Sequence, residues 1–247
     1  MALFKTANPA LGPEAFRSEN AAFGEAMTIS GTVNKTGILL LCCVATAVWS
    51  WNLFGRSPES AGALTLVGGI GGFIVAIVTV FNKTWAPVTA PLYALLEGLL
   101  LGSISAMLEV RYPGLPMQAV VLTFGTLAAL LLAYRAGVIR ATEPFKRGVF
   151  AATGGIAVFY LLQLVLGFFG VRFAAVNGSG AIGIGFSVIV VIVAALNLVL
   201  DFDFIEQGAA AGAPKYMEWY GAFGLIVTLI WLYLEILRLL TKLSSRR

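Results

Sequence analysis

Three carboxylates stand at the end of one of the most apolar stretches of the chain. Asp201, Asp203 and Glu206 lie in LNLVLDFDFIEQG, at the close of the run IGFSVIVVIVAALNLVL. Inserting an ionised acid near the centre of a membrane helix costs ~2.5–3.5 kcal/mol, so an acid in such a run needs a reason to be there. Cation binding and proton exchange are two reasons. The interfacial end of a helix is the third, and the pattern alone leaves these alternatives open.

The spacing of the two aspartates separates them on a helix. At ~100° per residue, Asp201 and Asp203 point ~200° apart, whereas Asn197 and Asp201 share a face. Only one aspartate can therefore face a bundle interior together with Asn197. We expect Asp201 to do so, and Asp203 and Glu206 to lie nearer the headgroups.

Glu97 is a fourth acid within an apolar run. It lies near the middle of APLYALLEGLLLGSISAMLEV, beside Gly98 and Gly102, whose small size would let another helix approach closely. We expect Glu97 to face the bundle interior, either protonated or hydrogen-bonded. A polar contact between helices and a functional role remain equal alternatives for it.

Glu235 is a fifth, in the last apolar run, YMEWYGAFGLIVTLIWLYLEILRLL. It shares a helix face with Arg238 and Lys242, so an ion pair within the helix is the simplest account. Acids on two consecutive helices can instead share a proton or a cation. Both accounts stay open.

Several chemistries are excluded or disfavoured by residue usage. The chain has no histidine, and its two cysteines, Cys42 and Cys43, are adjacent within an apolar run, so no metal-ligand spacing exists. GSGAIG matches a dinucleotide-binding pattern but lacks the preceding strand that such a site needs. No pair of nucleophile and base is found. We therefore expect neither an enzyme nor a bound cofactor.

Composition identifies the solvent of these helices. With 59% hydrophobic and 11% charged residues, the chain is an integral membrane protein. Its apolar runs are continuous, unlike the alternating strands of a barrel, and a helix needs about 20 residues to cross the bilayer. The sequence thus predicts an all-α, seven-span bundle over residues 37–247, preceded by a polar tail over residues 1–36. The predicted spans are 37–54, 62–81, 86–108, 117–135, 148–170, 181–203 and 219–241.

Lysines and arginines predict the orientation. With the N-terminus in the cytoplasm, cytoplasmic segments carry nine of them and the outer connections three. Four more cluster at the C-terminus, which seven crossings would place outside; a re-entrant seventh segment, giving six crossings, is the competing topology. Because basic residues beside spans are an ordinary topology signal, the net charge of +4 requires no nucleic-acid partner.

The two acidic motifs also carry a resemblance. WLYLEILRLL resembles the seventh-helix signature L-Y-L-D-x-x-x-L-x-x-L-L of the Bax inhibitor-1 (transmembrane Bax inhibitor motif) family, and LDFDFIEQG is similar to its sixth-helix motif. MTISGTVNKTGILLL and PLYALLEGLLLGSIS resemble the bacterial branch. Two departures stand out: Glu235 replaces an aspartate, and two aspartates precede the isoleucine of the sixth-helix motif.

This resemblance implies a fold, a function and a site. Six helices would surround the seventh, and the protein would be a pH-sensitive Ca²⁺ leak of a bacterial inner membrane. Asp201 and Glu235 would form a hydrogen-bonded pair in the ion path, closed when they share a proton. H⁺ and Ca²⁺ would then be regulatory or transported ions rather than cofactors. The residues expected to support the pair are Asp203, Asn197, Glu97 and Arg238.

The register of the last two spans and the function each have an alternative. An ideal hairpin between the last two spans would place Asp201 and Glu235 several turns out of register, unless PKYMEWY lies along the membrane interface and the span begins near Gly221, or unless a helix is broken. The competing function is that of a regulator without transport, whose N-terminal tail engages a membrane protease or a quality-control protein. The lipid bilayer is the partner common to both.

Overall fold

The computed structural model describes residues 26–171 and 173–246, which fold into helices with no β-strand among them. Residues 1–25, which belong to the predicted N-terminal tail, lie outside the described part. Seven helices are long and apolar enough to cross a membrane. They are α2 (Ile29–Arg56), α3 (Pro58–Phe81), α4 (Ala86–Arg111), α5 (Leu115–Arg135), α6 (Glu143–Phe168), α8 (Ala181–Ala210) and α9 (Met217–Ser244). Two short elements, η2 (Lys83–Trp85) and α7 (Ala174–Asn177), lie in connections.

Local sequence explains where these helices begin and end. Thr28 precedes α2 in an extended conformation, and its side chain accepts a hydrogen bond from the Gly31 amide. Four helices, α3 to α6, carry proline in their first turn, where its missing N–H has no helical partner to lose. Gly114 and Gly212 have positive φ in the turns before α5 and after α8, a conformation that other residues rarely adopt.

All seven helices extend beyond their predicted limits at one end or both, and two of these extensions change an expectation. α2 begins at Ile29, so residues 29–36, expected in the polar tail, form its first turns. α9 is one continuous helix from Met217 to Ser244. The expected separate interfacial segment, after which the span would begin near Gly221, is therefore not seen. This continuity removes the condition under which Asp201 and Glu235 were expected to meet.

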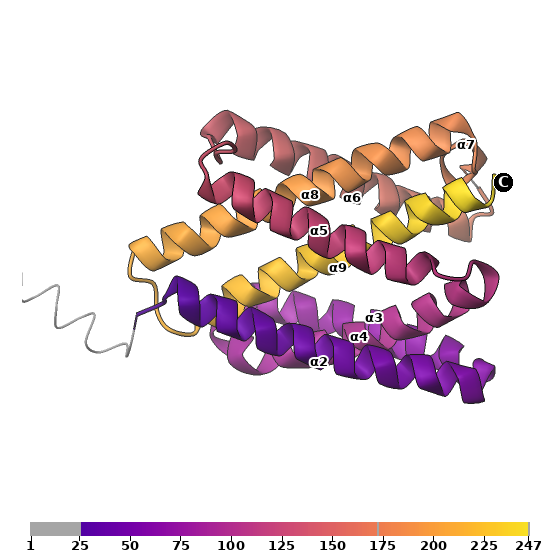
Figure 1. The fold of residues 1–247 in the computed structure, drawn as a ribbon, viewed down its shortest axis with the longest axis horizontal. Coiled ribbons are helices and arrows are strands. Elements are labelled where there is room, and N and C mark those ends of the chain that lie inside the picture. The colour runs from indigo at the N-terminus through magenta and orange to yellow at the C-terminus, as the bar shows by residue number, and fades with distance from the viewer. Residues whose placement is uncertain (1–25, 172, 247) are drawn as a thin grey trace, which may run out of the picture.

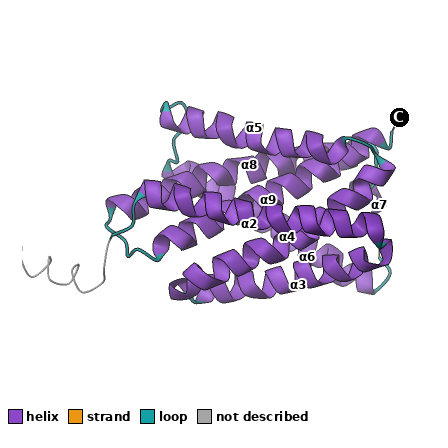
Figure 2. Ribbon diagram, turned by 60° about the horizontal axis from the view of Figure 1, so that its bottom comes forward, coloured by secondary structure: helices purple, strands orange, loops and turns teal. Residues whose placement is uncertain are grey.

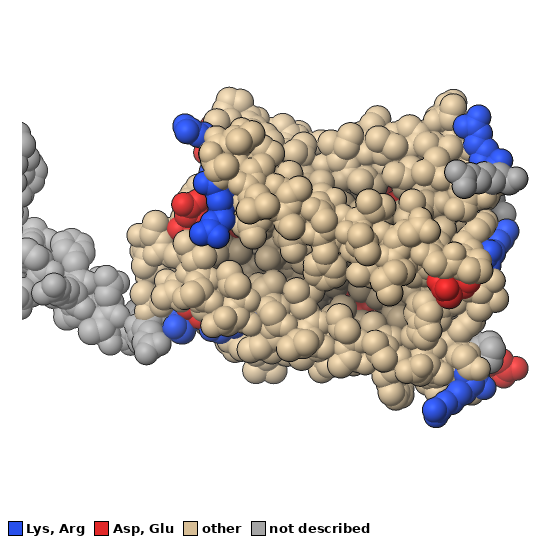
Figure 3. Space-filling view, viewed as in Figure 1, with Lys and Arg blue, Asp and Glu red and all other residues tan. Residues whose placement is uncertain are grey.

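The bundle has two polar ends and an apolar belt. The helices run lengthwise, and the first described residues and the C-terminus lie at opposite ends, as an odd number of crossings requires (Figures 1 and 2). On the face that Figure 3 shows, charged side chains gather at both ends and uncharged residues cover the middle. The seven-crossing topology fits this arrangement. Which end faces the cytoplasm stays a prediction.

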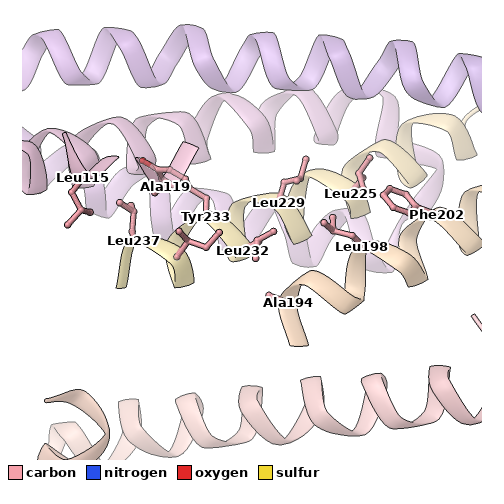
Figure 4. Packing of buried hydrophobic residues seen from close by; sticks show 11 residues of the cluster. Leu115, Ala119, Ala194, Leu198, Phe202, Leu225, Leu229, Leu232, Tyr233 and Leu237 are labelled. Atoms are coloured by element: carbon pink, nitrogen blue, oxygen red, sulfur yellow. The ribbon is translucent and has the colours of Figure 1, made fainter. Parts of the chain in front are cut away.

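α9 is the most enclosed helix. In its most apolar window 61% of the residues are buried, against 44% or less in the other spans. It packs against α2, α4, α5 and α8, whereas α3 packs mainly on α4 and α6 on α8. The largest apolar cluster joins α5, α8 and α9, with Leu198 and Phe202 facing Leu225 and Leu229 (Figure 4). α9 is thus central: α2, α4, α5 and α8 pack directly around it, and α3 and α6 lie farther out.

Glycine allows the closest helix approaches. A Cβ added at Gly98 would collide with Thr46 and one at Gly102 with Ser50, so α4 lies directly on α2 along this seam. The approach expected beside Glu97 is therefore confirmed. Gly154 and Gly155 differ, because nothing lies within 4 Å of an added Cβ at either position.

Candidate functional site

Asp201 lies inside the bundle against α9. Its carboxylate interacts with the Thr228 hydroxyl, and its Oδ1 would lie 3.8 Å from a Cβ added at Gly224. Its other oxygen, Oδ2, is buried and has no hydrogen-bond partner within the described part of the chain. A buried polar atom without a partner is rare and costs free energy, so it indicates a place where a proton, a water molecule or an ion belongs.

The two other acids of the same motif have partners on other helices. The Asp203 carboxylate pairs with Lys146 of α6 at 2.8 Å and accepts a hydrogen bond from Gln207. Glu206 accepts a hydrogen bond from Tyr134 of α5. Asp201 and Asp203 therefore face different helices, as their angular separation predicts, and Asp203 is neutralised where Asp201 is not.

Asn197 serves the contact between α6 and α8. Its side-chain amide donates to the Thr153 hydroxyl of α6 and to the Val193 carbonyl, both at 2.8 Å. It shares a face with Asp201 in sequence, but its hydrogen bonds hold α6 in place and do not reach the carboxylate.

Glu235 lies farther along α9, in a polar cluster with α6. Its side chain is buried, accepts a hydrogen bond from the Tyr160 hydroxyl at 2.9 Å and pairs with Arg238 at 3.3 Å. Arg238 also donates to Tyr160 and lies over its ring. The pairing of Glu235 with Arg238 within the helix is thus present, and Tyr160 is the partner that the sequence did not indicate.

Asp201 and Glu235 do not form a hydrogen-bonded pair in this structure. Asp201 faces Gly224 and Thr228, and Glu235 lies seven residues beyond Thr228, about 10 Å along the axis at ~1.5 Å per residue. The physical reason is the register that the hairpin count anticipated. α8 and α9 are both regular up to a short turn, so side chains at unequal distances from the turn stay apart.

Glu97 lies between α4 and α3. Its side chain is only 8% exposed and interacts with the Tyr93 hydroxyl, and an added Cβ at Gly72 would crowd its carboxylate. Glu97 therefore faces the interior beside α3, whereas Gly98 and Gly102 face α2. It is not a member of the α8–α9 site.

One family model, Bax inhibitor 1 like, matches residues 8–245, which is nearly the whole chain. The chain belongs to the Bax inhibitor 1 like family. No curated protein and no solved structure matches it.

The sequence did not indicate the most completely buried acid of this Bax inhibitor 1 like chain. Glu218, at the start of α9, accepts hydrogen bonds from the Thr28 amide and hydroxyl, both at 2.9 Å, and pairs with Lys35 and Lys215. Its position beside aromatic and charged residues suggested an interfacial stretch. Lys35 was the available signal: it lies nearly two turns into α2, where its half-buried ammonium needs an acid as its partner.

Lys242 also differs from its expected place beside Glu235. Its ammonium donates to the carbonyls of Val176 and Gly183 and to the Ser187 hydroxyl, at 2.8 to 2.9 Å. It therefore ties the end of α9 to α7 and the start of α8. Among the described residues no group of three or more acids, cysteines or histidines converges as a metal centre would.

Proposed function

We propose that this Bax inhibitor 1 like protein is a proton-sensitive cation leak, with Ca²⁺ as its cargo, in a bacterial inner membrane with the N-terminus in the cytoplasm. The observation that supports it is the buried Oδ2 of Asp201, which has no partner within the described part. A carboxylate held in the bundle without a fixed countercharge attracts a cation when ionised and loses that attraction when protonated.

Asp201 and Glu235 act as successive stations in this proposal instead of as one bonded pair. Asp201 has only the neutral Thr228 beside it on α9, and no ion pair of the described residues includes it. Glu235 has Arg238 and Tyr160 beside it. A cation passing along α9 from its N-terminal end would first meet the Asp201 carboxylate, which has no countercharge. It would then meet the Glu235 carboxylate, which must give up its contact with Arg238 to bind the cation.

The sign of the pH dependence follows from the charge. Acidification protonates Asp201 and removes the negative charge that attracts the cation, so flux should fall as the pH drops. Asp201→Asn removes the same charge permanently at nearly constant shape. It should lower flux at high pH and flatten the pH profile.

Purified protein in liposomes with an enclosed Ca²⁺ indicator tests this directly. The matched control is Asp203→Asn, since Asp203 stands two residues away and is already paired with Lys146; its profile should keep the parent's shape. A parent protein that carries no cation at any pH would overturn the proposal. A profile that only Asp203→Asn flattens would remove Asp201 from it.

A further inference from the structure

A cavity of about 560 Å³ lies between α2, α4, α5 and α9, away from the acids of the proposed ion path. Its size is that of a small-molecule site, for which ~300–1,000 Å³ is usual. Its outer rim includes Val44 and Val48 of α2 and Met117 and Val120 of α5, which are also exposed on the surface of the bundle. The cavity therefore opens sideways, between α2 and α5, where Figure 3 shows the surface hollowed.

The inner wall is formed by α9. Ile226, Leu229, Ile230 and Tyr233 line it, and each is at most 8% exposed. Lipid in contact with the outer surface of the bundle cannot reach these side chains. A hydrocarbon chain that entered between α2 and α5 would reach them.

The polar groups of the lining are already satisfied. The hydroxyls of Ser105 and Tyr233 bond to each other at 2.7 Å, Thr123 donates to the Ala119 carbonyl at 2.8 Å, and Glu109 accepts from the Gly114 amide at 3.0 Å. Each of these groups thus has a partner within the protein. An apolar cavity of this kind stays dry or takes an apolar occupant.

The depth of the cavity matches one leaflet. Its lining on α2 runs from Leu40 to Trp51, about 16 Å at ~1.5 Å per residue, which is about half of the ~30 Å of hydrocarbon. Its polar end lies at Glu109 and Gly114, beside the turn between α4 and α5. The cavity thus extends from headgroup level to the middle of the bilayer.

The cavity has room for an extended hydrocarbon chain. Its volume of about 560 Å³ over a length of about 16 Å gives an average cross-section of about 35 Å². Because its lining is mostly apolar and its opening faces the lipid, a hydrocarbon chain is the occupant that its chemistry favours.

We propose that this cavity binds one acyl chain of a phospholipid from the leaflet on the side of the α4–α5 turn. The chain enters between α2 and α5 and lies against α9, with the headgroup near Glu109. This site goes beyond the proposed ion leak and does not depend on it.

Photo-crosslinking in liposomes tests the site. The probe is a phosphatidylcholine with a diazirine near the middle of one acyl chain, and the adducts are located by peptide mass spectrometry. We expect adducts on α9 between Ile226 and Tyr233, as well as on the outward belt. Adducts confined to the belt would overturn the proposal, and so would α9 adducts formed only by a free fatty acid carrying the same diazirine.

Two matched pairs of variants complete the test. Ala47→Phe fills the cavity from α2, and Ala45→Phe places the same ring on the exposed side of that helix. Val120→Phe and Val121→Phe form the equivalent pair on α5. Each cavity-filling variant should lose the α9 adducts, and each control should keep them. If one cavity-filling variant fails to fold, the other pair of variants gives the answer. If the α9 adducts persist in the cavity-filling variants, the acyl chain does not occupy this cavity.

Discussion

Two acids at the α9 interface, the buried Glu218 and the half-buried Asp201, have opposite surroundings. Glu218 receives two hydrogen bonds from Thr28 and pairs with Lys35 and Lys215. Asp201 has the Thr228 hydroxyl and an oxygen without a partner. The difference teaches what each carboxylate can do. A saturated acid fixes helices in place, whereas an unsaturated acid can take up and release a proton or a cation.

Glu218 is placed where it joins parts far apart in the sequence. Through Thr28 and Lys35 it ties the start of α9 to the start of α2, and the nearby Met27 amide donates to the Ala213 carbonyl of the α8–α9 turn. These contacts close one end of the bundle. Asp201, in contrast, contacts Gly224 and Thr228 within α9 and takes part in none of these contacts at the helix ends.

The largest expected effect is the loss of the Glu218 contacts. Glu218→Ala leaves two lysines and the Thr28 amide without their acceptor, and we expect a loss of about 3 kcal/mol in the free energy of unfolding. That value is the low end of the ~3–5 kcal/mol for breaking a buried pair, because both lysines can reach water. Thermal unfolding in detergent measures it.

Glu143→Ala is the control for that measurement. Glu143 also pairs with a lysine three residues away, Lys146, but its side chain is 72% exposed. Exposed pairs contribute little, so its melting temperature should stay close to the parent's. Equal shifts in the two variants would mean that Glu218 is no more than a surface ion pair.

A smaller effect is expected from crowding the Glu218 carboxylate. A Cβ added at Gly31 would overlap it, so Gly31→Ala should destabilise the bundle by about 1–3 kcal/mol, as overpacking usually does. Gly37→Ala, on the same helix, meets nothing within 4 Å and should raise stability by up to about 1 kcal/mol. Melting temperatures that move in the same direction would contradict the close contact.

The sequence predicted the helices better than their contacts. Span number and type follow from runs whose length the bilayer dictates, and the seam of Gly98 and Gly102 follows from small residues at helical spacing. The contact of Lys35 with Glu218, and that of Tyr160 with Glu235, depend on how distant helices are rotated and shifted against each other. No local pattern contains that information.

The proposed pairing of Asp201 with Glu235 shows the same limit. Resemblance to a family motif suggested the pair, while counting residues from the turn predicted a mismatch of several turns. Because α9 is a continuous helix from Met217, the mismatch predicted by counting residues is the one that the structure has. Asp201 faces α9 and Asp203 faces α6, as the angular separation of two aspartates spaced by two residues predicts.

A third effect should be close to zero or stabilising. Asp201→Asn keeps the shape of the side chain and its contact with Thr228, and it removes a buried charge without a countercharge. We expect the melting temperature to be unchanged or raised, and the free energy of unfolding to increase by no more than about 1 kcal/mol. Glu218→Gln, the equivalent isosteric change at the saturated acid, should lower it. A marked loss in Asp201→Asn would show that its charge is paired after all.

The smallest expected effect is a coupling energy, and it separates two stations from one bonded pair. Asp201→Asn, Glu235→Gln and the double variant form a double-mutant cycle on the Ca²⁺ flux at high pH. Because Glu235 lies about 10 Å along α9 from the Thr228 neighbour of Asp201, the two losses should add to within about 0.5 kcal/mol, or roughly a factor of two in flux. Tyr160→Phe with Glu235→Gln provides the positive control, since these side chains share a hydrogen bond of 2.9 Å and should couple. A double variant no worse than either single one would mean that the carboxylates titrate together, in an arrangement of α8 and α9 that brings them into contact.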